Sequence, residues 1–593
     1  MEDRTILAVI LSLIVVLVYY RFFAPQAPQA PVNPPTQEEN LNRKNQKDKI
    51  PSSDMIPDGR DTSLGQEITQ LLEAQKNEKP RDIIIETEKY QACISTDGAR
   101  ITSWKLKDYR LSQDYENIPW NGSFWKRVAS SYKSYFASLF RSSEDSREKD
   151  NIDLFQLSKT GEGYGLQIVS GERLPGKGEK PAGDYYSGVY RTDAQNIVLN
   201  PRHPKETVKL TYITANGFQV DKLLTFSYDS YQVDMEVLST NLKESESTLD
   251  YSLLLGPGLG NAFQKGAHKF EGPVTWLNGK KIKDKPGKNA GDVQHQGNIS
   301  WTAMTSNYFM AALIPQSEES TVSVYRPSIN SKENIDLNKA TTISLHYPAK
   351  KIAARSSQKD LYRFYFGPKD YEILKSLGIN LEQALDYGVF SFLAKPLMWL
   401  LNWFYRLIPN YGIAIILLTL LIKIVFWPLT DKSFRSMKEM QELQPKLTSL
   451  REKYKSDPKK LNEELMNMYK QKGINPMGGC LPLLLQIPVF FALYEGLMVS
   501  IELRGAPFIL WIKDLSIMDP LLITPLLMGL TMYIQQKMTP MSGDATQMKM
   551  MTMMPLIFTV FFLGFPSGLV IYWLLNNVLT IGQHYLILKK MGA

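Results

Sequence analysis

Cysteine and histidine are scarce in this chain: its 593 residues include two cysteines and five histidines. Cys93 and Cys480 fall in segments that the arguments below place on opposite sides of a membrane, so we expect neither a disulfide framework nor a cysteine-based metal site. The histidines are scattered without the spacing of metal ligands. They are His203, His268, His295, His346 and His584. The sequence therefore predicts no metal site and no other cofactor.

The features of two large functional classes are also missing. The formal net charge of +8 is modest for this length. The sequence has no dense stripe of lysine and arginine, so we do not expect it to recognise a specific nucleic-acid sequence. The glycine-rich phosphate loop of nucleotide-binding proteins does not occur, which favours a process that is not driven by nucleotide hydrolysis. We therefore expect no catalytic residues and no enzymatic activity.

Apolar residues make up 44% of the chain, and their distribution is uneven. They concentrate in residues 5–23 and again after residue 390, whereas the middle of the chain is polar. A chain of this length is too long for one compact core, so at least two domains are expected. This partition predicts a membrane protein with one large soluble domain.

The N-terminal apolar run, residues 5–23, is long enough to span a membrane. It ends in Tyr19-Tyr-Arg-Phe-Phe23, which lacks the small residues of a signal-peptide cleavage site. We therefore interpret residues 1–23 as an uncleaved transmembrane anchor. Residues 24–81 are rich in proline and glutamine at first and then polar and charged, which predicts a disordered linker that acts as a spacer.

Residues 82–378 show the pattern of a β domain. Apolar and polar residues alternate, and Asp97-Gly98 and Asn216-Gly217 are typical of hairpin turns. Turn signals recur without an intervening long helical period, so we predict a β-sandwich. Residues 108–200 are less regular and are expected to contain long loops or insertions.

The remainder, residues 379–593, is predicted to be helical and to lie in the membrane. Residues 392–408 are rich in aromatics with Lys395 and Arg406 near their ends, which indicates a helix in the membrane interface. Further apolar runs predict spans that, with the anchor, bring the total to six. These runs lie near residues 411–429, 481–501, 520–536, 552–565 and 567–588.

The distribution of charge predicts the orientation. Residues 431–472 contain eleven lysines and arginines against seven acidic residues, whereas residues 502–519 contain only Arg504 and Lys513 as basic residues. The positive-inside tendency places residues 431–472 in the cytoplasm, so the β domain lies outside and both termini inside. Residues 431–472 also favour a helical hairpin interrupted near Pro458, and a solvated loop is the alternative.

Lys423 is the main functional candidate, because it lies in the otherwise apolar run 411–428. A charge at membrane depth costs about 2.5–3.5 kcal/mol even on the most lenient scale, so such a group usually lines a wet cavity or has a partner. The span is expected to end near Thr430, about 10 Å from Lys423. Thr419 lies one helical turn away and could hydrogen-bond on the same face. The alternative is a lysine whose amine extends to the nearby interface.

Several other polar residues fall within the predicted spans, and they allow two interpretations. They could line a shared hydrated groove, or they could form interhelical hydrogen bonds. These residues are Gln486, Glu495, Asn576, Asn577 and Gln583. Glu495 lies about 21 Å along its span, well above Lys423, so we expect no direct salt bridge between the two.

The C-terminal part resembles the YidC family of membrane protein insertases over about residues 380–588. The matching stretches are Asn410–Ile416, Pro428–Thr430, Leu443–Leu447, Asn475–Pro482, Gln486–Tyr494, Glu502–Phe508, Phe558–Phe562 and Phe565–Tyr572. The order of anchor, linker and external β domain resembles the Gram-negative form. The resemblance implies a bacterial inner-membrane protein whose periplasmic domain is a β-supersandwich similar to sugar mutarotases.

The resemblance also implies a groove among the last five spans, open to the cytoplasm and to lipid. By position, Lys423 matches the positive residue of that groove and Thr419 its neighbour. Tyr572 and Trp573 match an aromatic wall. Gln486 matches a polar groove position, and Asn576 is included with these residues. Most members of the family carry arginine where this chain has Lys423, and only lysine can lose its proton in a buried site.

Three classes of function remain. The leading one is a non-enzymatic insertase and chaperone for nascent membrane proteins, acting alone or with the Sec translocon. The resemblance suggests the Sec translocon and translating ribosomes as partners. The tail after Leu588 is short, so the ribosome is expected to bind through the hairpin 431–472. A solute transporter or channel that uses the intramembrane charge is the alternative. A membrane-tethered sugar enzyme is the third, although the histidines of the β domain form no recognisable motif.

Overall fold

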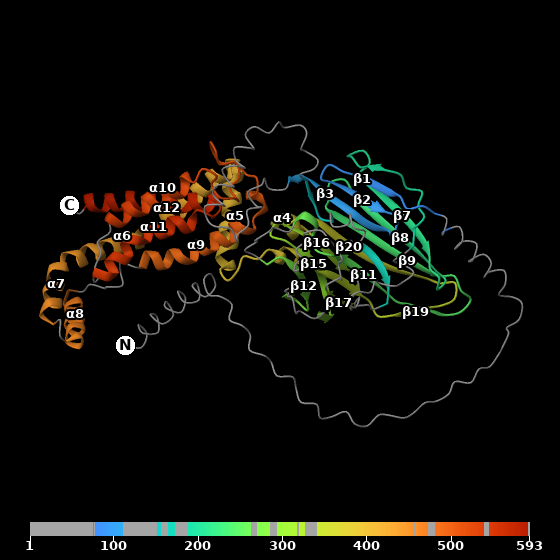
Figure 1. The fold of residues 1–593 in the computed structure, drawn as a ribbon, viewed down its shortest axis with the longest axis horizontal. Helices are drawn as coiled ribbons and strands as arrows, with labels where there is room; N and C mark the ends of the chain where they lie inside the picture. Colours follow the sequence, from blue (N-terminus) through green and yellow to red (C-terminus); the bar gives the residue numbers. More distant parts are fainter. Residues whose placement is uncertain are drawn as a thin grey trace, which may run out of the picture. The chain divides into compact units, whose positions relative to one another are not determined.

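The computed structural model describes two regions, one of β-sheets and one of helices (Figure 1). The description covers residues 75, 78–110, 151–155, 164–171, 188–262, 270–284, 293–316, 320–325, 341–454, 457–472, 481–538 and 545–590. The predicted anchor, almost all of the predicted linker and much of the irregular stretch 108–200 lie outside these residues. Everything described below belongs to one compact unit, Leu64–Ala593.

The largest sheet has eight antiparallel strands. Its order is β13 (Lys280–Lys283), β12 (Gly272–Leu277), β15 (Ile299–Thr305), β16 (Phe309–Pro315), β20 (Ser357–Pro368), β9 (Gln232–Asn241), β8 (Phe218–Ser227) and β7 (Lys205–Ile213). The predicted turn at Asn216-Gly217 joins β7 to β8, and Gly217 there adopts a φ of +76° that favours glycine. Among the described strands, β13 lies at one edge of this sheet and pairs with β12 alone.

Three smaller sheets complete the β region. One has the order β4 (Asn151–Asp153), β3 (Arg100–Arg110), β2 (Tyr90–Ser95), β1 (Asp82–Glu86) and β6 (Ile197–Val198). A second has the order β14 (Val293–Gly297), β17 (Ser320–Tyr325), β18 (Thr342–His346), β11 (Tyr251–Gly256) and β5 (Tyr164–Ser170). A two-stranded sheet pairs β10 (Ser247–Leu249) with β19 (Lys350–Ile352). The Asp97-Gly98 turn joins β2 to β3, as predicted.

One hydrophobic core unites the two five-stranded sheets and the eight-stranded sheet. Trp104 of β3 stacks on Tyr90 of β2 with ring centroids 4.0 Å apart, and its edge meets Phe366 of β20 at 5.0 Å. The core continues past the last strand, because Leu374, Leu381 and Ala384 also belong to it. Two of these residues lie in the short helix η3 (Leu381–Ala384) and one in α4 (Tyr371–Ser376), which Asp370 caps by accepting from the Ile373 amide.

The helical region begins with α5 (Ser391–Leu407), at the place predicted for an interfacial helix. The other helices of the bundle are α6 (Tyr411–Glu442), α9 (Leu481–Val499), α10 (Ile523–Met538), α11 (Ala545–Phe562) and α12 (Ser567–Lys590). Figure 1 shows them side by side; α12 contacts α6, α9 and α10, and α5 contacts α6 and α9. The predicted turn at residues 565–568 separates α11 from α12. Two shorter described elements are η2 (Gly260–Ala262) and η4 (Ile501–Leu503).

Among the described residues, one helix is both long and apolar enough to cross a membrane. It comprises Tyr411–Met440, with a mean hydropathy of 2.4 in its most apolar window. Gln486–Val499 and Thr552–Phe562 are shorter apolar helices.

The segment predicted as a helical hairpin, residues 431–472, begins inside the helix that carries Lys423. The helix α6 continues past Thr430 to Glu442, because the onset of charge at Asp431 marks a change of surroundings and not a helix stop. After Leu443, α7 (Gln444–Lys453) is followed by α8 (Pro458–Lys472). The sparse apolar residues of this segment pack together. They are Met440, Leu443 and Leu447, against Leu465, Met468 and Tyr469.

Candidate functional site

Lys423 lies on α6, and its side chain reaches α12. Its Nζ donates to Oγ1 of Thr580 on α12 at 2.6 Å, and that hydroxyl in turn donates to the carbonyl oxygen of Asn576 at 2.6 Å. Thr580 is buried, and the lysine side chain is partly buried. The amine is therefore directed at a buried hydroxyl of a neighbouring helix, which is not the arrangement of a lysine that extends to the interface.

The electrostatic surroundings of Lys423 are sparse. Among the described residues, no carboxylate lies within ion-pair distance of its amine, and its polar contact is the Thr580 hydroxyl. Glu495 is placed elsewhere: its carboxylate packs against Gly388, where an added Cβ would lie 3.0 Å from Cδ of Glu495. Gly388 precedes α5 in the connection from the β region, so the expected absence of a Lys423–Glu495 bridge agrees with the geometry of the described part of the chain.

The Thr419 hydroxyl is satisfied within its own helix. It donates to the carbonyl oxygen of Ile415 at 2.6 Å, and the side chain is buried. This bond to the preceding turn is the usual way for a threonine inside a helix to satisfy its hydroxyl. Thr419 thus faces the packed side of α6.

Gln486 and Tyr572 are brought together. Their side chains are hydrogen-bonded across α9 and α12, and Tyr572 is fully buried in the helical core. Trp573, next along α12, packs edge-on against Phe490 with centroids 4.8 Å apart and lies 5.4 Å from Phe562. The two predicted wall residues therefore have different positions: Tyr572 is part of the packed core, and Trp573 is a partly exposed member of an aromatic cluster.

Two of the polar residues on α12 form interhelical hydrogen bonds. Asn577 Nδ2 donates to the carbonyl oxygen of Met528 at 3.4 Å and to Oγ1 of Thr531 at 3.3 Å, both on α10. Gln583 Nε2 donates to the carbonyl oxygen of Trp427 on α6 at 3.3 Å. For Asn577 and Gln583 the helix-packing interpretation is therefore the better one.

Thr580 is the residue that sequence reasoning missed. It lies one helical turn after Asn576, and residues four apart share a face of a helix, so that spacing was the available signal. The bond to Lys423 could not be found this way, because it depends on how α12 is aligned with α6, 157 residues earlier in the chain.

The described residues contain no group of three or more histidine, cysteine or acidic side chains that could hold a metal ion. In the β region, His295 pairs with Asp284 at 3.0 Å. His346 Nδ1 lies 3.2 Å from Oγ of Ser252 and 3.6 Å from Asp250. Ser252 and Asp250 approach the same ring nitrogen, so these three residues do not form a relay in which the histidine links an acid to a nucleophile.

Two family descriptions match this chain, and together they cover most of it. Residues 137–400 match the YidC periplasmic domain, and residues 403–593 match the 60Kd inner membrane protein family. The boundary between the two matches falls within α5, where the sheet region gives way to the helices.

Curated relatives match over the whole length. A protein of Syntrophus aciditrophicus (strain SB) named membrane protein insertase YidC is 37% identical and covers 100% of both chains. A protein of the same name from Geotalea daltonii is 36% identical, again over 100% of both chains. One from Geobacter sulfurreducens is 40% identical over 69% of this chain and 75% of its own.

Solved structures match more weakly. A crystal structure of an active YidC insertase with its first transmembrane domain resolved is 16% identical and covers 88% of this chain and 98% of its own, with a TM-score of 0.34. A putative aldose 1-epimerase from Escherichia coli K12 is 8% identical and covers 49% of this chain and 99% of its own, with a TM-score of 0.27. Likeness at this level carries no argument, so the conclusion rests on the full-length relatives. This chain belongs to the YidC family of membrane protein insertases.

Proposed function

We propose that this insertase receives the polar part of a client chain at the Lys423 amine, in a groove among its membrane helices. One observation carries this proposal: the amine is held between α6 and α12 by the neutral hydroxyl of Thr580 and by no carboxylate in the described part of the chain. A lysine amine has three N–H donors. Thr580 accepts from one, which leaves two for an acidic or polar group of a client.

The energetics of this scheme need no nucleotide. A polar segment entering the bilayer must exchange its hydration for protein partners, and a fixed cation lowers that cost for acidic groups most. Transfer of the client's neighbouring apolar residues into lipid supplies about 25 cal/mol per Å². The amine therefore lowers the barrier for the polar segment, while the apolar segment supplies the driving force.

Gln486, Asn576 and Trp573 are proposed to line the same groove. All three are partly exposed, and they come from α9 and α12. Tyr572 supports the groove from behind, because it is buried and hydrogen-bonded to Gln486. Thr419 is proposed to support the groove indirectly, by packing α6 against its neighbours, since its own hydroxyl is satisfied within the helix.

The proposed topology has six spans, with both termini and the α7–α8 hairpin in the cytoplasm and a supersandwich domain in the periplasm. The positive surplus of residues 431–472 supports this orientation. The hairpin has its own small apolar core, which supports a folded arm that docks translating ribosomes. Cooperation with the Sec translocon is proposed from the family resemblance.

Complementation tests the role of Lys423. In cells depleted of their own insertase, Lys423→Arg is expected to support growth and insertion, because the charge is kept. Lys423→Met keeps the length and apolar stem but removes the charge. Loss of charge-assisted bonds worth about 1.5–3 kcal/mol predicts a decrease in insertion of about tenfold or more for clients with acidic segments. Normal insertion by Lys423→Met at equal protein level would refute the proposal.

A further inference from the structure

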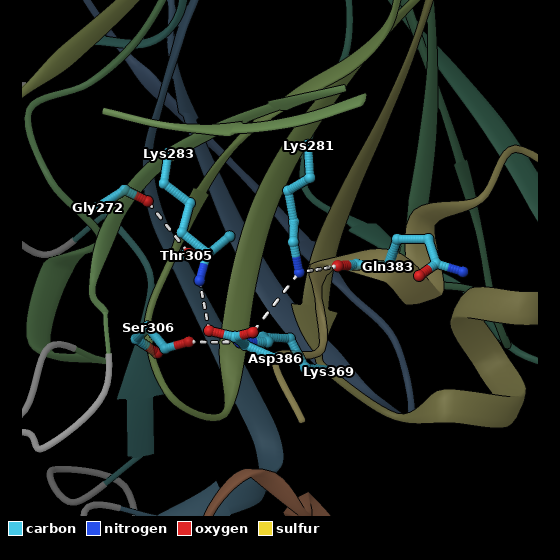
Figure 2. Close-up of polar contacts among 8 residues, drawn as sticks. All are labelled: Gly272, Lys281, Lys283, Thr305, Ser306, Lys369, Gln383 and Asp386. Atoms are coloured by element: carbon cyan, nitrogen blue, oxygen red, sulfur yellow. Dashed lines mark hydrogen bonds and ion pairs between the residues drawn. The ribbon is translucent and has the colours of Figure 1, made fainter. Parts of the chain in front are cut away.

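A cluster of lysines surrounds one carboxylate where the chain leaves the β region for α5. Lys281 and Lys283 come from the edge strand β13, and Lys369 directly follows β20. Asp386 lies between η3 and α5. Figure 2 shows the ammonium groups of Lys281 and Lys283 converging on the carboxylate of Asp386 from the same strand.

The contacts leave these two lysines only partly engaged. Lys283 Nζ forms an ion pair with Asp386 Oδ2, and Lys281 Nζ lies 3.8 Å from Asp386 Oδ1 while donating to the carbonyl oxygen of Gln383 at 2.9 Å. The Lys283 side chain remains 31% exposed and the Lys281 side chain 25% exposed. Lys369 is buried and donates to the carbonyl oxygen of Ser306 at 2.9 Å.

Positive charge is in excess at this place. Burial lowers the pKa of Lys281; Asp386 opposes this effect, and Lys283 and Lys395 reinforce it. Two lysines thus act on Lys281 against one carboxylate. A bound anion would relieve this repulsion, because an opposite charge favours the protonated form of each lysine.

The cluster also has apolar walls. Phe270 lies under the Lys283 ammonium, 5.7 Å from ring centroid to Nζ, and Val274 and Val499 line the same pocket. A pocket with cations and apolar side chains together fits a ligand whose charged group is joined to an apolar body.

The position of the lysine cluster next to α5 indicates the chemical class of the anion that it would bind. Asp386 lies just before α5, and α5 exposes Phe392, Trp399 and Trp403. Exposed aromatic residues of this kind are typical of the level of lipid headgroups. Lys395 in the second turn of α5 acts on Lys281, so this helix and the cluster are close to one another.

We propose that Lys281 and Lys283, with Lys395 of α5, bind the phosphodiester headgroup of an anionic phospholipid from the periplasmic leaflet. The site would fix the edge of the β region to the bilayer surface at the start of the helical region. Basic pockets of this kind recognise phosphate through ammonium groups acting as point charges. This inference rests on the interfacial position proposed for α5, and it does not depend on the role of Lys423.

The test measures lipid binding to the full-length protein in detergent by native mass spectrometry, with phosphatidylglycerol and phosphatidylcholine as probes. The variant Lys281→Gln/Lys283→Gln is compared with Lys280→Gln. Lys280 is exposed on the same strand, and alternation directs it to the other face. Each lysine near an anionic lipid surface strengthens binding about fivefold. Loss of two lysines should therefore weaken binding of phosphatidylglycerol about 30-fold in the double variant. Lys280→Gln should stay within about twofold of the unmodified protein.

Further arms make each outcome decisive. Lys281→Arg/Lys283→Arg keeps the charge and should retain binding, which separates a charge effect from misfolding. Unchanged binding by the glutamine double variant, or equal loss in Lys280→Gln, would overturn the proposal. Full displacement of the lipid by millimolar inorganic phosphate would assign the site to a free anion and would overturn the proposal. The proposal would also be overturned if the glutamine double variant bound lipid normally but no longer captured an acidic peptide, because the site would then belong to a protein partner. Lys423→Met should bind lipid normally even if it cannot insert clients.

Discussion

The β region and the helical region each contain a lysine held inside the fold without a carboxylate partner, and the two are satisfied differently. Lys222 of β8 is fully buried, and its amine donates to the carbonyl oxygens of Ala99 and Leu166. Lys423 of α6 is partly buried and donates to the hydroxyl of Thr580. The first lysine is engaged by the backbone of two other segments, whereas the second contacts one side-chain hydroxyl, and we propose that its remaining donors meet a client.

The acceptors of Lys222 are themselves unusual. Ala99 and Leu166 adopt φ values of +47° and +60°, a region that non-glycine residues rarely occupy. Lys222 thus ties the eight-stranded sheet to the β2–β3 turn and to β5, at two backbone positions that need support. The number and kind of acceptors therefore differ between the two lysines: two backbone carbonyls hold Lys222, and one hydroxyl holds Lys423.

The largest effect is expected for Lys222→Met. Two buried carbonyl groups lose their donor, and each unsatisfied group costs about 1–3 kcal/mol, so the free energy of unfolding should fall by about 2–6 kcal/mol. The buried rings of Trp104 and Trp301 make near-ultraviolet circular dichroism a measure of this region. Lys205→Met on the exposed part of β7 is the control and should change little. An equally stable Lys222→Met protein would remove the distinction drawn between the two lysines.

The dependence of insertion on Thr580 comes next. Thr580→Val removes the acceptor that holds the Lys423 amine, and interhelical hydrogen bonds in membranes average about 0.6 kcal/mol, with a maximum near 1.7. We expect insertion to fall about threefold to tenfold, and Thr580→Ser to restore it. Thr580→Val should have no effect when combined with Lys423→Met. Additive losses in the double variant would show that Thr580 acts independently of the lysine.

The pH dependence of the free energy of unfolding tests the burial of the Lys222 amine. Burial lowers the pKa of Lys222 to about 7, against about 10.5 when unfolded. Above pH 10.5 the amine is neutral in both states, and as pH falls the unfolded state takes up the proton first. Stability should therefore decrease as pH falls from about 10 to 7 and then level off, by at most about 1.4 kcal/mol per unit. Unfolding of the unmodified protein and Lys222→Met between pH 7.5 and 9.5 should reveal this slope only in the former.

The smallest effect is expected for the residues that only join helices. Gln583→Leu loses one bond to the Trp427 carbonyl and gains apolar contact, so thermal stability should change by about 0.6 kcal/mol or less. Insertion of clients with acidic segments should stay normal. A large insertion defect in Gln583→Leu would extend the groove to residues that we assign to packing.

Local chemistry explains what the sequence could predict. The Asp97-Gly98 and Asn216-Gly217 turns need only neighbouring residues, and the short connection between α11 and α12 follows from Pro566 and the residues beside it. Lys423 was found because a charge contrasts with an apolar run. These features depend on local conformational preference and on transfer energy, both of which a single segment contains.

Alignment between distant elements explains what the sequence could not predict. The bond of Lys423 to Thr580 and that of Gln486 to Tyr572 depend on how helices pack, which no single segment determines. The end of α6 at Glu442 could not be predicted from the onset of charge at Asp431, because charge marks a change of surroundings, while a helix continues as long as its backbone bonds are favourable. Lys222 lies on the buried face of β8 with Val220 and Leu224, but its acceptors, the carbonyl groups of Ala99 and Leu166, come from elements whose alignment the strand alone does not determine.

Photo-crosslinking from position 576, with Lys423 kept, tests the central claim most directly. A photoreactive side chain at 576, a partly exposed position one helical turn before Thr580, is compared with one at Val578, which is exposed on α12 next to Asn577. With a ribosome-bound client stalled at partial insertion, the account predicts strong crosslinks to the client's polar segment from 576, much weaker ones from 578, and loss of the 576 crosslinks in Lys423→Met. Equal crosslinking from both positions, or crosslinks from 576 that are unchanged in Lys423→Met, would contradict the account.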